Sequence, residues 1–467
     1  MNLSRRTLFT GSLGGGLALA SAAGAVPKAN PEFAWIDAVM EEHRAPGVAA
    51  VIVAGGATLA GITRGRASLG LGVPVTDRPL FHAGSVGKHI TVAAALRLVE
   101  RGKLSLEAPV GDYARDVPAH LGNRPLRSLL DHTSGFPDYS DGIEWDRPFD
   151  RATFHRLIRH YPAEFEAGTA WNYSNAAYVL VGYILEDVAG KDYARIVGDD
   201  LFRPHGLTDS RVDQADQPIP GRAEPYAWTD GHYAHAVRMS GQVSSVAAGG
   251  ILMSMRDVVP WVAALHGGGV LSRPVLDTMT MPVRLSTGRP IPYGLGWMLD
   301  QMPDGTALHY HGGSVPGFRT MHIRVPHRDL SIMVVANADT LAASIIAWRL
   351  LEQCAAGTTP LSLPTIADKA PGMTALARSI VTRARHPLDP ALFAPEQVLH
   401  LAAGRDHVIP QLTAAQVETM TGFTLVQEDM DADGLRRRRY RAQFPTYARH
   451  VDFRHLTDGR IYFVRIQ

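Results

Sequence analysis

Residues 81–96 read FHAGSVGKHITVAAAL and place a serine and a lysine at the start of a predicted helix. From residue 89 onward, apolar side chains recur every three to four residues, and Gly102 then provides a typical helix end. We therefore predict a helix over residues 89–104. Ser85 and Lys88 are three residues apart, so their side chains share one face and lie within reach of each other.

This pair has a definite chemical potential. A serine hydroxyl is a weak nucleophile unless a nearby base removes its proton, and an amine held close can act as that base. The N-terminus of a helix adds a positive field and backbone N–H groups that can stabilise a developing oxyanion. Ser85 and Lys88 are therefore candidates for covalent catalysis.

Two further motifs could contribute to the same chemistry. Tyr173-Ser174-Asn175 lies directly before a predicted helix over residues 175–189, which ends at Gly190. Without a catalytic role, Asn175 would serve as the cap of that helix. His311-Gly312-Gly313 ends a predicted strand, where backbone N–H groups could face a substrate.

In this order, the three motifs resemble those of the serine β-lactamase and penicillin-binding superfamily. The likeness is greatest to class C β-lactamases and to the related DD-peptidases, D-aminopeptidases and esterases. It extends from about residue 31 to residue 353 and includes LLDHTSGFPDY at 129–139, Ala-Gly-Gly at 248–250 and YGLGW at 293–297. A match along the whole segment is far more specific than any single motif.

The resemblance implies a role for each motif residue. Ser85 would be the acylated nucleophile and Lys88 its proton partner. Tyr173 would act as general base and later as proton donor to the leaving group, and Asn175 would hold the acyl-side amide of the substrate. The backbone N–H groups of Ser85 and Ser314 would form the oxyanion hole.

The strand motif departs from the β-lactamase pattern. His311-Gly312-Gly313 stands where most class C β-lactamases have Lys-Thr-Gly, and we expect His311 and Gly313 to line the substrate site. The replacements remove two groups that would bind a β-lactam carboxylate. A histidine has a reference pKa of about 6.5 and is mostly uncharged near neutrality. We therefore expect esters or neutral amides to be better substrates than β-lactams, and binding of carboxylates to weaken from about pH 6 to 8.

The pattern of elements predicts an α/β (α+β) fold in which helices flank an antiparallel sheet. Residues 31–44 predict an amphipathic helix, and Gly55-Gly56 predicts a hairpin turn. The middle of the chain, roughly residues 110–265, is mostly helical and would form a helical subdomain. A meander and a helix follow it. The predicted strands are 48–54, 57–63, 294–299, 307–311, 318–325 and 330–337, and the last helix is 341–356.

We divide the chain into a hydrolase domain over residues 26–356, a linker over 357–372 and a small, mostly β domain over 373–467. The linker contains three prolines with several serines and threonines. The small domain ends in two predicted hairpins, over residues 424–444 and 451–466. Its run of four arginines at 436–439 would pair across the first hairpin with Glu428, Asp429 and Asp431 rather than bind nucleic acid.

Residues 1–25 are predicted to be an export signal rather than part of the fold. Ser4-Arg5-Arg6-Thr7-Leu8-Phe9 resembles the bacterial twin-arginine motif, and Ala23-Gly24-Ala25 is suited to a signal peptidase. The stretch between them is too short and too rich in glycine for a membrane span. We therefore expect a periplasmic or secreted protein without a stable membrane span.

Composition restricts the partners. The 467 residues include 46 Lys+Arg and 45 Asp+Glu, and this balance argues against an electrostatic binder of nucleic acid. The single cysteine, Cys354, excludes an intrachain disulfide and a cysteine metal cluster. We expect no cofactor and no metal, and a small-molecule or peptide substrate.

Three alternatives remain open. Ala83-Gly84-Ser85-Val86-Gly87 is also similar to a variant nucleophile elbow of an α/β-hydrolase, which would need a parallel sheet and a Ser-His-Asp triad. His309 and His311 alternate onto one strand face and could begin a metal site, although no third ligand stands at a recognisable spacing. A non-catalytic peptidoglycan sensor would keep the fold and become labelled on Ser85 without releasing product.

Overall fold

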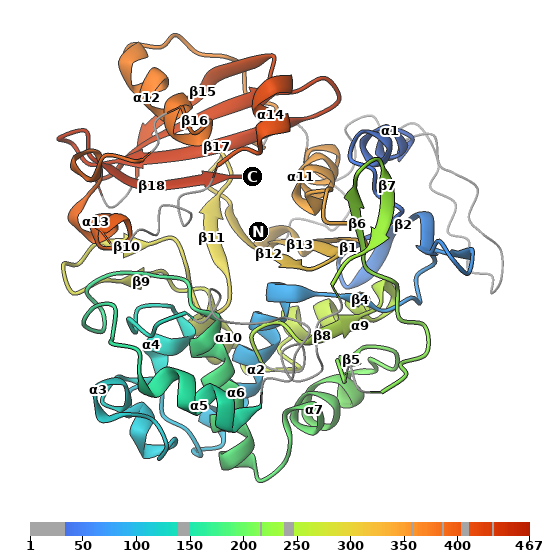
Figure 1. Cartoon of the computed structure of the whole chain (residues 1–467), viewed down its shortest axis with the longest axis vertical. Coiled ribbons are helices and arrows are strands. Elements are labelled where there is room, and N and C mark those ends of the chain that lie inside the picture. The colour runs from blue at the N-terminus through green and yellow to red at the C-terminus, as the bar shows by residue number, and fades with distance from the viewer. Residues whose placement is uncertain are drawn as a thin grey trace, which may run out of the picture.

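The main sheet consists of seven strands, and each strand is antiparallel to its neighbours (Figure 1). We describe it from a computed structural model, which covers residues 33–138, 150–214, 217–237, 247–355, 359–384, 387–402, 411–431 and 434–467. In sheet order the strands are β11 (Met298–Gln301), β12 (Ala307–Val315), β13 (Phe318–Val325), β14 (Leu330–Ala336), β1 (Gly47–Ala54), β2 (Ala57–Ser68) and β3 (Val73–Pro74).

The sheet confirms the predicted hairpin and meander, but β12 continues beyond the predicted end at residue 311 to Val315, so His311 lies within the strand and not at its end. Gly55 and Gly56 both have positive φ, 57° and 78°, as a tight turn between β1 and β2 requires. The antiparallel order also rules out the α/β-hydrolase alternative, which needs a parallel sheet. The predicted strand over 294–299 was wrong at its start, because residues 294–297 form a turn closed by the Gly294 N–H bond to Trp297 O at 2.8 Å.

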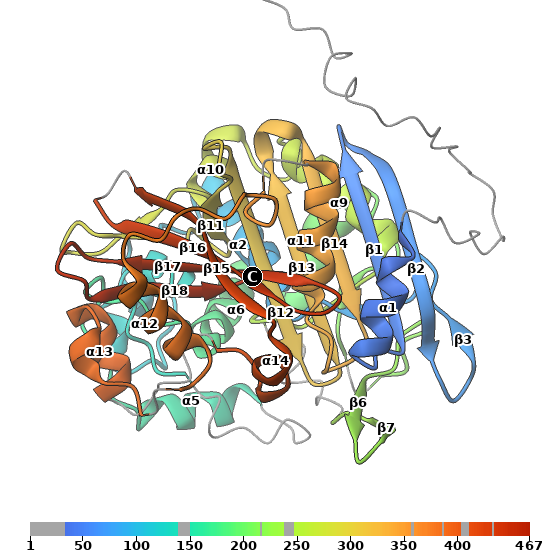
Figure 2. The ribbon, with the colours of Figure 1, turned by 90° about the horizontal axis from the view of Figure 1, so that it is seen from above.

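Each face of the sheet is covered by helices, because the strands alternate their apolar side chains between two cores. On one face α1 (Trp35–Glu42) and α11 (Ala343–Cys354) pack on Val48, Ile332 and Val334 (Figure 2). On the other, α2 (Lys88–Glu100) and α9 (Met255–His266) pack on the opposite side chains of the same strands. The helices predicted at 31–44 and 341–356 thus exist in shorter form.

Helix α2 is buried on almost every side. It runs between the sheet and α6 (Asn175–Ala189), which explains why its apolar residues are not confined to one stripe. A short 3₁₀ turn, η2 (Gly84–Gly87), precedes it, and α2 ends four residues before the predicted end at residue 104. Residue 85 therefore lies on a tight turn at the N-terminus of a central helix.

The middle of the chain supplies the helical subdomain. It contains short helices and three small sheets. Its helices are α3 (Ala119–Gly122), α4 (Leu126–Leu130), α5 (Arg151–Arg159), α6, α7 (Tyr193–Arg195), the π-helix η5 (Ile196–Phe202) and α10 (Arg273–Met279). The small sheets pair β4 (Phe81–His82) and β5 (Arg211–Val212) with β8 (Ile251–Met253), β6 (Tyr226–Thr229) with β7 (His232–His235), and β9 (Val283–Arg284) with β10 (Pro290–Ile291).

In its described residues, the C-terminal domain has a four-stranded antiparallel sheet and three α-helices. Its elements are α12 (Pro371–Val381), α13 (Pro395–Ala402), α14 (Ala414–Thr419), β15 (Gly422–Met430), β16 (Arg436–Gln443), β17 (Ala448–His455) and β18 (Ile461–Ile466). Both predicted hairpins are present. Side chains of this sheet share one continuous apolar core with α11 and β14, so the two domains pack directly together.

The predicted charge pairing in the first C-terminal hairpin is confirmed for Glu428 and Asp429, whereas Asp431 lies 3.6 Å from Arg454 of β17. Arg437 binds Asp429 at 2.8 Å and Arg438 binds Glu428 at 3.2 Å. The described part of the predicted linker is residues 359–372. Its last two residues belong to α12, so the linker ends at residue 370, two residues earlier than predicted. Residues 359–370 contain no helix or strand, and Arg441 of the hairpin donates to Leu363 O at 2.9 Å.

The predicted export signal, residues 1–25, lies outside the described residues. Within the part of the chain that the structure describes, every helix is too short or too polar to cross a bilayer.

Candidate active site

The structure brings Ser85 and Lys88 together as the sequence predicted. Ser85 lies in the η2 turn and Lys88 is the first residue of α2, so both side chains project from the same side of the helix start. Lys88 Nζ donates to Ser85 Oγ at 3.2 Å. Lys88 is fully buried, whereas Ser85 is only half-buried and can be reached from outside.

Lys88 has two further acceptors. Its Nζ lies 2.8 Å from Asn175 Oδ1 and 2.5 Å from Ala248 O. Burial lowers the Lys88 pKa from 10.5 to about 7, although the Asp138 carboxylate opposes this shift. A neutral amine has two N–H groups and one lone pair. With the N–H groups on Asn175 and Ala248, the lone pair faces the hydroxyl of Ser85.

Asn175 is oriented by the carboxylate of Asp138. Asp138 accepts from Asn175 Nδ2 at 3.3 Å and from the backbone N–H groups of Asn175 and Ala176 at 3.2 and 3.3 Å. The Asn175 oxygen is thereby directed to Lys88. The N-cap of α6 is Ser174, whose Oγ accepts from Ala177 N, so Asn175 is not the cap that the alternative interpretation proposed.

Tyr173 lies beside the same lysine. The centre of its ring is 4.9 Å from Lys88 Nζ. Its hydroxyl is buried and has no hydrogen-bond partner of acceptable geometry among the described residues. Burial raises the pKa of Tyr173 well above 10, and the nearby Ser85 hydroxyl offsets only part of this rise. The phenol is therefore protonated at neutral pH, which argues against the expected role of Tyr173 as general base and leaves its expected role as proton donor.

A chain of hydrogen bonds links the Tyr173 motif to the His311 motif. Ser174 N–H donates to His132 Nδ1 at 3.1 Å, so the proton of the neutral His132 ring is on Nε2, 3.2 Å from Tyr293 Oη. Tyr293 in turn donates to His311 Nε2 at 3.3 Å, and His311 Nδ1–H donates to Gly312 O at 2.7 Å. The bond from Ser174 at one end and the bond to Gly312 at the other are consistent with one set of proton positions along the chain of hydrogen bonds.

His311 is consequently a neutral residue with both ring nitrogens engaged. It is only 2% exposed. Burial, followed by the charge of Lys88, lowers its pKa to about 3. The lowered pKa contradicts the sequence-based expectation that His311 titrates near its reference value, and it removes the basis for a change in carboxylate binding between pH 6 and 8. A buried ring beside a cation cannot retain a proton at those pH values.

Backbone N–H groups of β12 and the η2 turn meet at close range. A Cβ atom on Gly313 would lie 2.1 Å from Ala83 O and 3.3 Å from Ser85 N. A Cβ on Gly84, whose φ is +53°, would lie 3.0 Å from Ser314 N. Only glycine allows the two backbones to approach this closely. The N–H groups of Ser85 and Ser314 are thereby neighbours, as an oxyanion hole requires.

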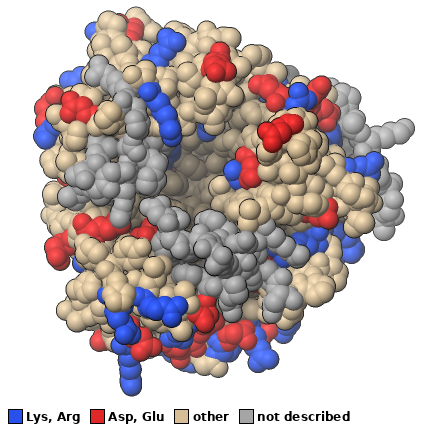
Figure 3. All heavy atoms as spheres, in the orientation of Figure 1, with Lys and Arg blue, Asp and Glu red and all other residues tan. Residues whose placement is uncertain are grey.

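The molecular surface is hollowed near the middle of one face (Figure 3). In the same orientation, Figure 1 places this region between the C-terminal strands and the helices of the subdomain. Uncharged residues line most of the hollow, and Lys, Arg, Asp and Glu gather mainly around it.

Four groups in this site were not predicted from the sequence: His132, Asp138, Tyr293 and the carbonyl of Ala248. All four lie in segments that resemble the superfamily, and that likeness was the available signal. The structure adds that His132, although not glycine, has a φ of +65°.

No group of three or more His, Cys, Asp or Glu is arranged to hold a metal ion within the residues that the structure describes. His309 and His311 have different surroundings. His311 is engaged by Tyr293 and Gly312, whereas the Nδ1 of His309 has no partner among the described residues.

Taken together, fold and geometry define a serine-centred site of the kind that carries out acyl transfer. Residues 33–355 match the family model described as Beta-lactamase, so the chain belongs to this family. It is therefore related to serine hydrolases.

Known proteins agree with this assignment. Penicillin-binding protein 4* of Bacillus subtilis is 29% identical over 57% of this chain and 62% of its own length. Esterase EstB of Burkholderia gladioli is 32% identical over 42% of this chain and 56% of its own. The chain thus matches about 60% of the length of these relatives. The octameric penicillin-binding protein homologue from Pyrococcus abyssi superposes with a TM-score of 0.62 at 18% identity, covering 92% of this chain and 93% of the other.

Proposed function

We propose that the protein is a periplasmic serine hydrolase that forms an acyl-enzyme on Ser85 and hydrolyses esters or neutral amides. The observation that carries the proposal is the 3.2 Å contact between Lys88 Nζ and Ser85 Oγ, with the Lys88 pKa lowered to about 7. At neutral pH, half of such lysines are neutral and can accept the serine proton.

In the acylation step, Ser85 Oγ attacks the substrate carbonyl carbon while its proton passes to Lys88 Nζ. The carbonyl oxygen becomes an oxyanion that the N–H groups of Ser85 and Ser314 stabilise. As the intermediate collapses, Tyr173 gives its proton to the leaving oxygen or nitrogen and takes the proton held by Lys88. Water then repeats the sequence on the acyl-enzyme, releasing the acid and restoring Ser85.

The pKa directions support this division of labour between Lys88 and Tyr173. Lys88, with its pKa lowered to about 7, suits the base in the first step. Tyr173, with its pKa raised above 10, stays protonated in the free site and donates its proton once Lys88 has become cationic beside it. Asn175 would bind the acyl side of the substrate and orient Lys88.

The surroundings of His311 support the substrate class. With His311 neutral, its strand position offers no cation to a substrate carboxylate. An uncharged ester or amide needs no such anchor, and EstB, a relative, is by name an esterase. We therefore propose that His311 and Gly313 shape the site for neutral substrates and that β-lactams are turned over poorly.

The decisive experiment compares hydrolysis of p-nitrophenyl esters, D-amino acid amides, D-Ala-D-Ala peptides and nitrocefin. A serine-directed phosphonate should add once, on Ser85, and Ser85→Ala should lose both adduct and activity. Ser379→Ala serves as the matched control, because the Ser379 hydroxyl donates to Leu376 O within helix α12 of the C-terminal domain. Labelling of Ser85 without release of any product would instead support a sensor.

We further propose that the arginine pair at residues 5 and 6 directs export after folding. Replacing both arginines by lysine should leave the protein in the cytoplasm, as fractionation of cells would show.

A further inference from the structure

We propose that the C-terminal domain positions the Ser85 site, through Arg465, which holds the segment that carries Tyr293. This inference rests on the function proposed above and assigns a task to the domain that follows the family segment. The domain contacts residues 290–299 through its last strand, β18.

Arg465 of β18 binds this segment at both of its ends. Its guanidinium donates to Pro292 O at 3.2 Å, to Leu299 O at 3.4 Å and to Met298 Sδ at 3.3 Å. Arg465 is only 6% exposed, so these contacts are shielded from water. A planar guanidinium with several fixed N–H groups restrains the backbone on both sides of the intervening turn.

Tyr462, also on β18, holds the same segment from the other side of the strand. Its hydroxyl donates to Pro290 O at 3.0 Å. Its ring belongs to a small apolar cluster with Tyr293, Ile291 and Leu435. Tyr293 therefore packs directly against residues of the C-terminal domain.

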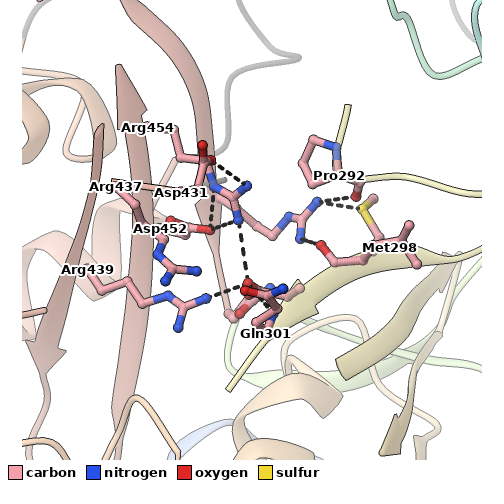
Figure 4. A network of polar contacts seen from close by, with 12 residues as sticks. Pro292, Met298, Gln301, Asp431, Arg437, Arg439, Asp452 and Arg454 are labelled. Atoms are coloured by element: carbon pink, nitrogen blue, oxygen red, sulfur yellow. Dashed lines mark hydrogen bonds and ion pairs between the residues drawn. The ribbon is translucent and has the colours of Figure 1, made fainter. Parts of the chain in front are cut away.

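Buried ion pairs fix the strand that follows. Arg439 pairs with Asp300 on β11, and Arg454 lies 3.5 Å from Asp300 and 2.9 Å from Asp452 (Figure 4). Asp300, Arg439 and Asp452 are almost entirely buried. A buried charge is costly unless it keeps its partner, so this network permits one register of β11 against the C-terminal sheet.

Tyr293 connects the segment held by Arg465 directly to the site. Tyr293 follows Pro292 directly, and its hydroxyl joins His132 to His311. A shift of this hydroxyl would leave His311 Nε2 without its donor, close to Lys88. The charge of Arg465 also contributes, after burial and Lys88, to the lowered pKa of His311.

The test is a double-mutant cycle with Arg465→Met and Tyr293→Phe, assayed on a p-nitrophenyl ester. We expect Arg465→Met alone to lower kcat/KM by about tenfold or more, since small misplacements in a site have effects of this size. In the Tyr293→Phe background the same change should cost less than about twofold. Equal losses in both backgrounds would overturn the route through Tyr293.

Arg441→Met is the matched control. Arg441 belongs to the same sheet and also donates to backbone carbonyls, but to those of Leu361 and Leu363. We expect it to retain wild-type kcat/KM, and a loss equal to that of Arg465→Met would point to general destabilisation and overturn the proposal. Should Arg465→Met fail to fold, Tyr462→Phe removes a single hydroxyl, and its loss should likewise vanish in Tyr293→Phe.

A spectroscopic measurement separates this inference from the proposed function. In ¹⁵N-histidine spectra, the His311 signals, assigned with His311→Gln, should move in Arg465→Met and stay in place in Arg441→Met. Unmoved signals in Arg465→Met would overturn the inference even if the enzyme is active. A wild type that hydrolyses no ester or amide would overturn the proposed function, while the spectrum would still test the coupling.

Discussion

Tyr293 donates its phenolic proton to His311 Nε2 over 3.3 Å. Because Nδ1–H of the same ring donates to Gly312 O, this bond requires His311 to be neutral. His311 is consequently an uncharged side chain, held by two hydrogen bonds, at the strand position where most class C β-lactamases carry a lysine.

The first prediction follows from this neutrality. His311→Lys should improve kcat/KM for nitrocefin relative to a p-nitrophenyl ester by at least about threefold, because it adds a cation for the carboxylate. His327→Lys, on an exposed turn, is the control and should leave the ratio unchanged. A wild type that prefers nitrocefin to every ester would contradict our interpretation of His311.

The pH profile should report the ionisation of Lys88. With a Lys88 pKa of about 7, kcat/KM for a neutral ester should rise up to about pH 7 and level off above it, because the neutral amine is the base. The Asp138 carboxylate raises this pKa, so Asp138→Asn should move the midpoint to lower pH. Asp187→Asn, which alters a surface pair with Arg151, should not move it.

Removal of the lysine amine should be nearly as harmful as removal of the serine. We expect Lys88→Ala to lower kcat by about three orders of magnitude or more, since nucleophile and base act as a unit. Lys191→Ala breaks only a half-exposed pair with Asp200 and should remain within about twofold of wild type. Steady-state kinetics on one ester would decide, and an active Lys88→Ala would exclude the mechanism.

Tyr173→Phe should lower kcat by at least about a hundredfold, the low end for a proton-transfer group. The ring would still pack near Lys88, so thermal stability should change little. Tyr233→Phe, on an exposed hairpin, controls for loss of a hydroxyl elsewhere. An ester with a very acidic leaving group should lose less activity than a poor one, because its departure needs no proton.

Acid should destabilise the fold through its buried histidines. His82 has a pKa lowered to about 4, and His322 one lowered to about 3, in both cases chiefly by burial. As pH falls from about 6.5 to about 4, the unfolded chain gains protons that the native state does not bind, so the free energy of unfolding decreases.

Denaturant unfolding at several pH values would test this loss. His322→Gln removes one such group. The two ring nitrogens of His322 have no hydrogen-bond partner among the described residues. Its free energy of unfolding should depend less steeply on pH between about 6.5 and 4 than that of the wild type. Identical slopes would mean that His322 does not contribute.

Local patterns in the sequence predicted the parts of the fold that local forces determine. The strand over 318–325 was predicted with both its ends, because the Gly317 turn and Pro326 bound it. The pair Ser85 and Lys88 was predicted because three residues of helix bring them together. Arg437 and Arg438 pair with predicted acidic residues across one hairpin.

Local patterns in the sequence did not predict the contacts between distant segments. Arg439 lies in the same run of arginines but pairs with Asp300, on another sheet. The chain of bonds from His132 through Tyr293 to His311 joins three loops and strands whose packing no local spacing encodes. The pKa of His311 was predicted incorrectly for the same reason, because burial is a property of the assembled structure.

The close approach of Gly84 and Gly313 has a consequence for directed evolution. A Cβ at Gly313 would overlap Ala83 O, and one at Gly84 would press on Ser314 N from a positive φ that side chains rarely adopt, so randomising either codon should mostly yield inactive clones. Gly312 differs, because a Cβ there would meet Met321 Cε at 3.7 Å and Thr320 O at 3.8 Å, which are ordinary contacts. A library aimed at new substrates should leave the two crowded glycines untouched and place its diversity at position 312, where related β-lactamases carry threonine.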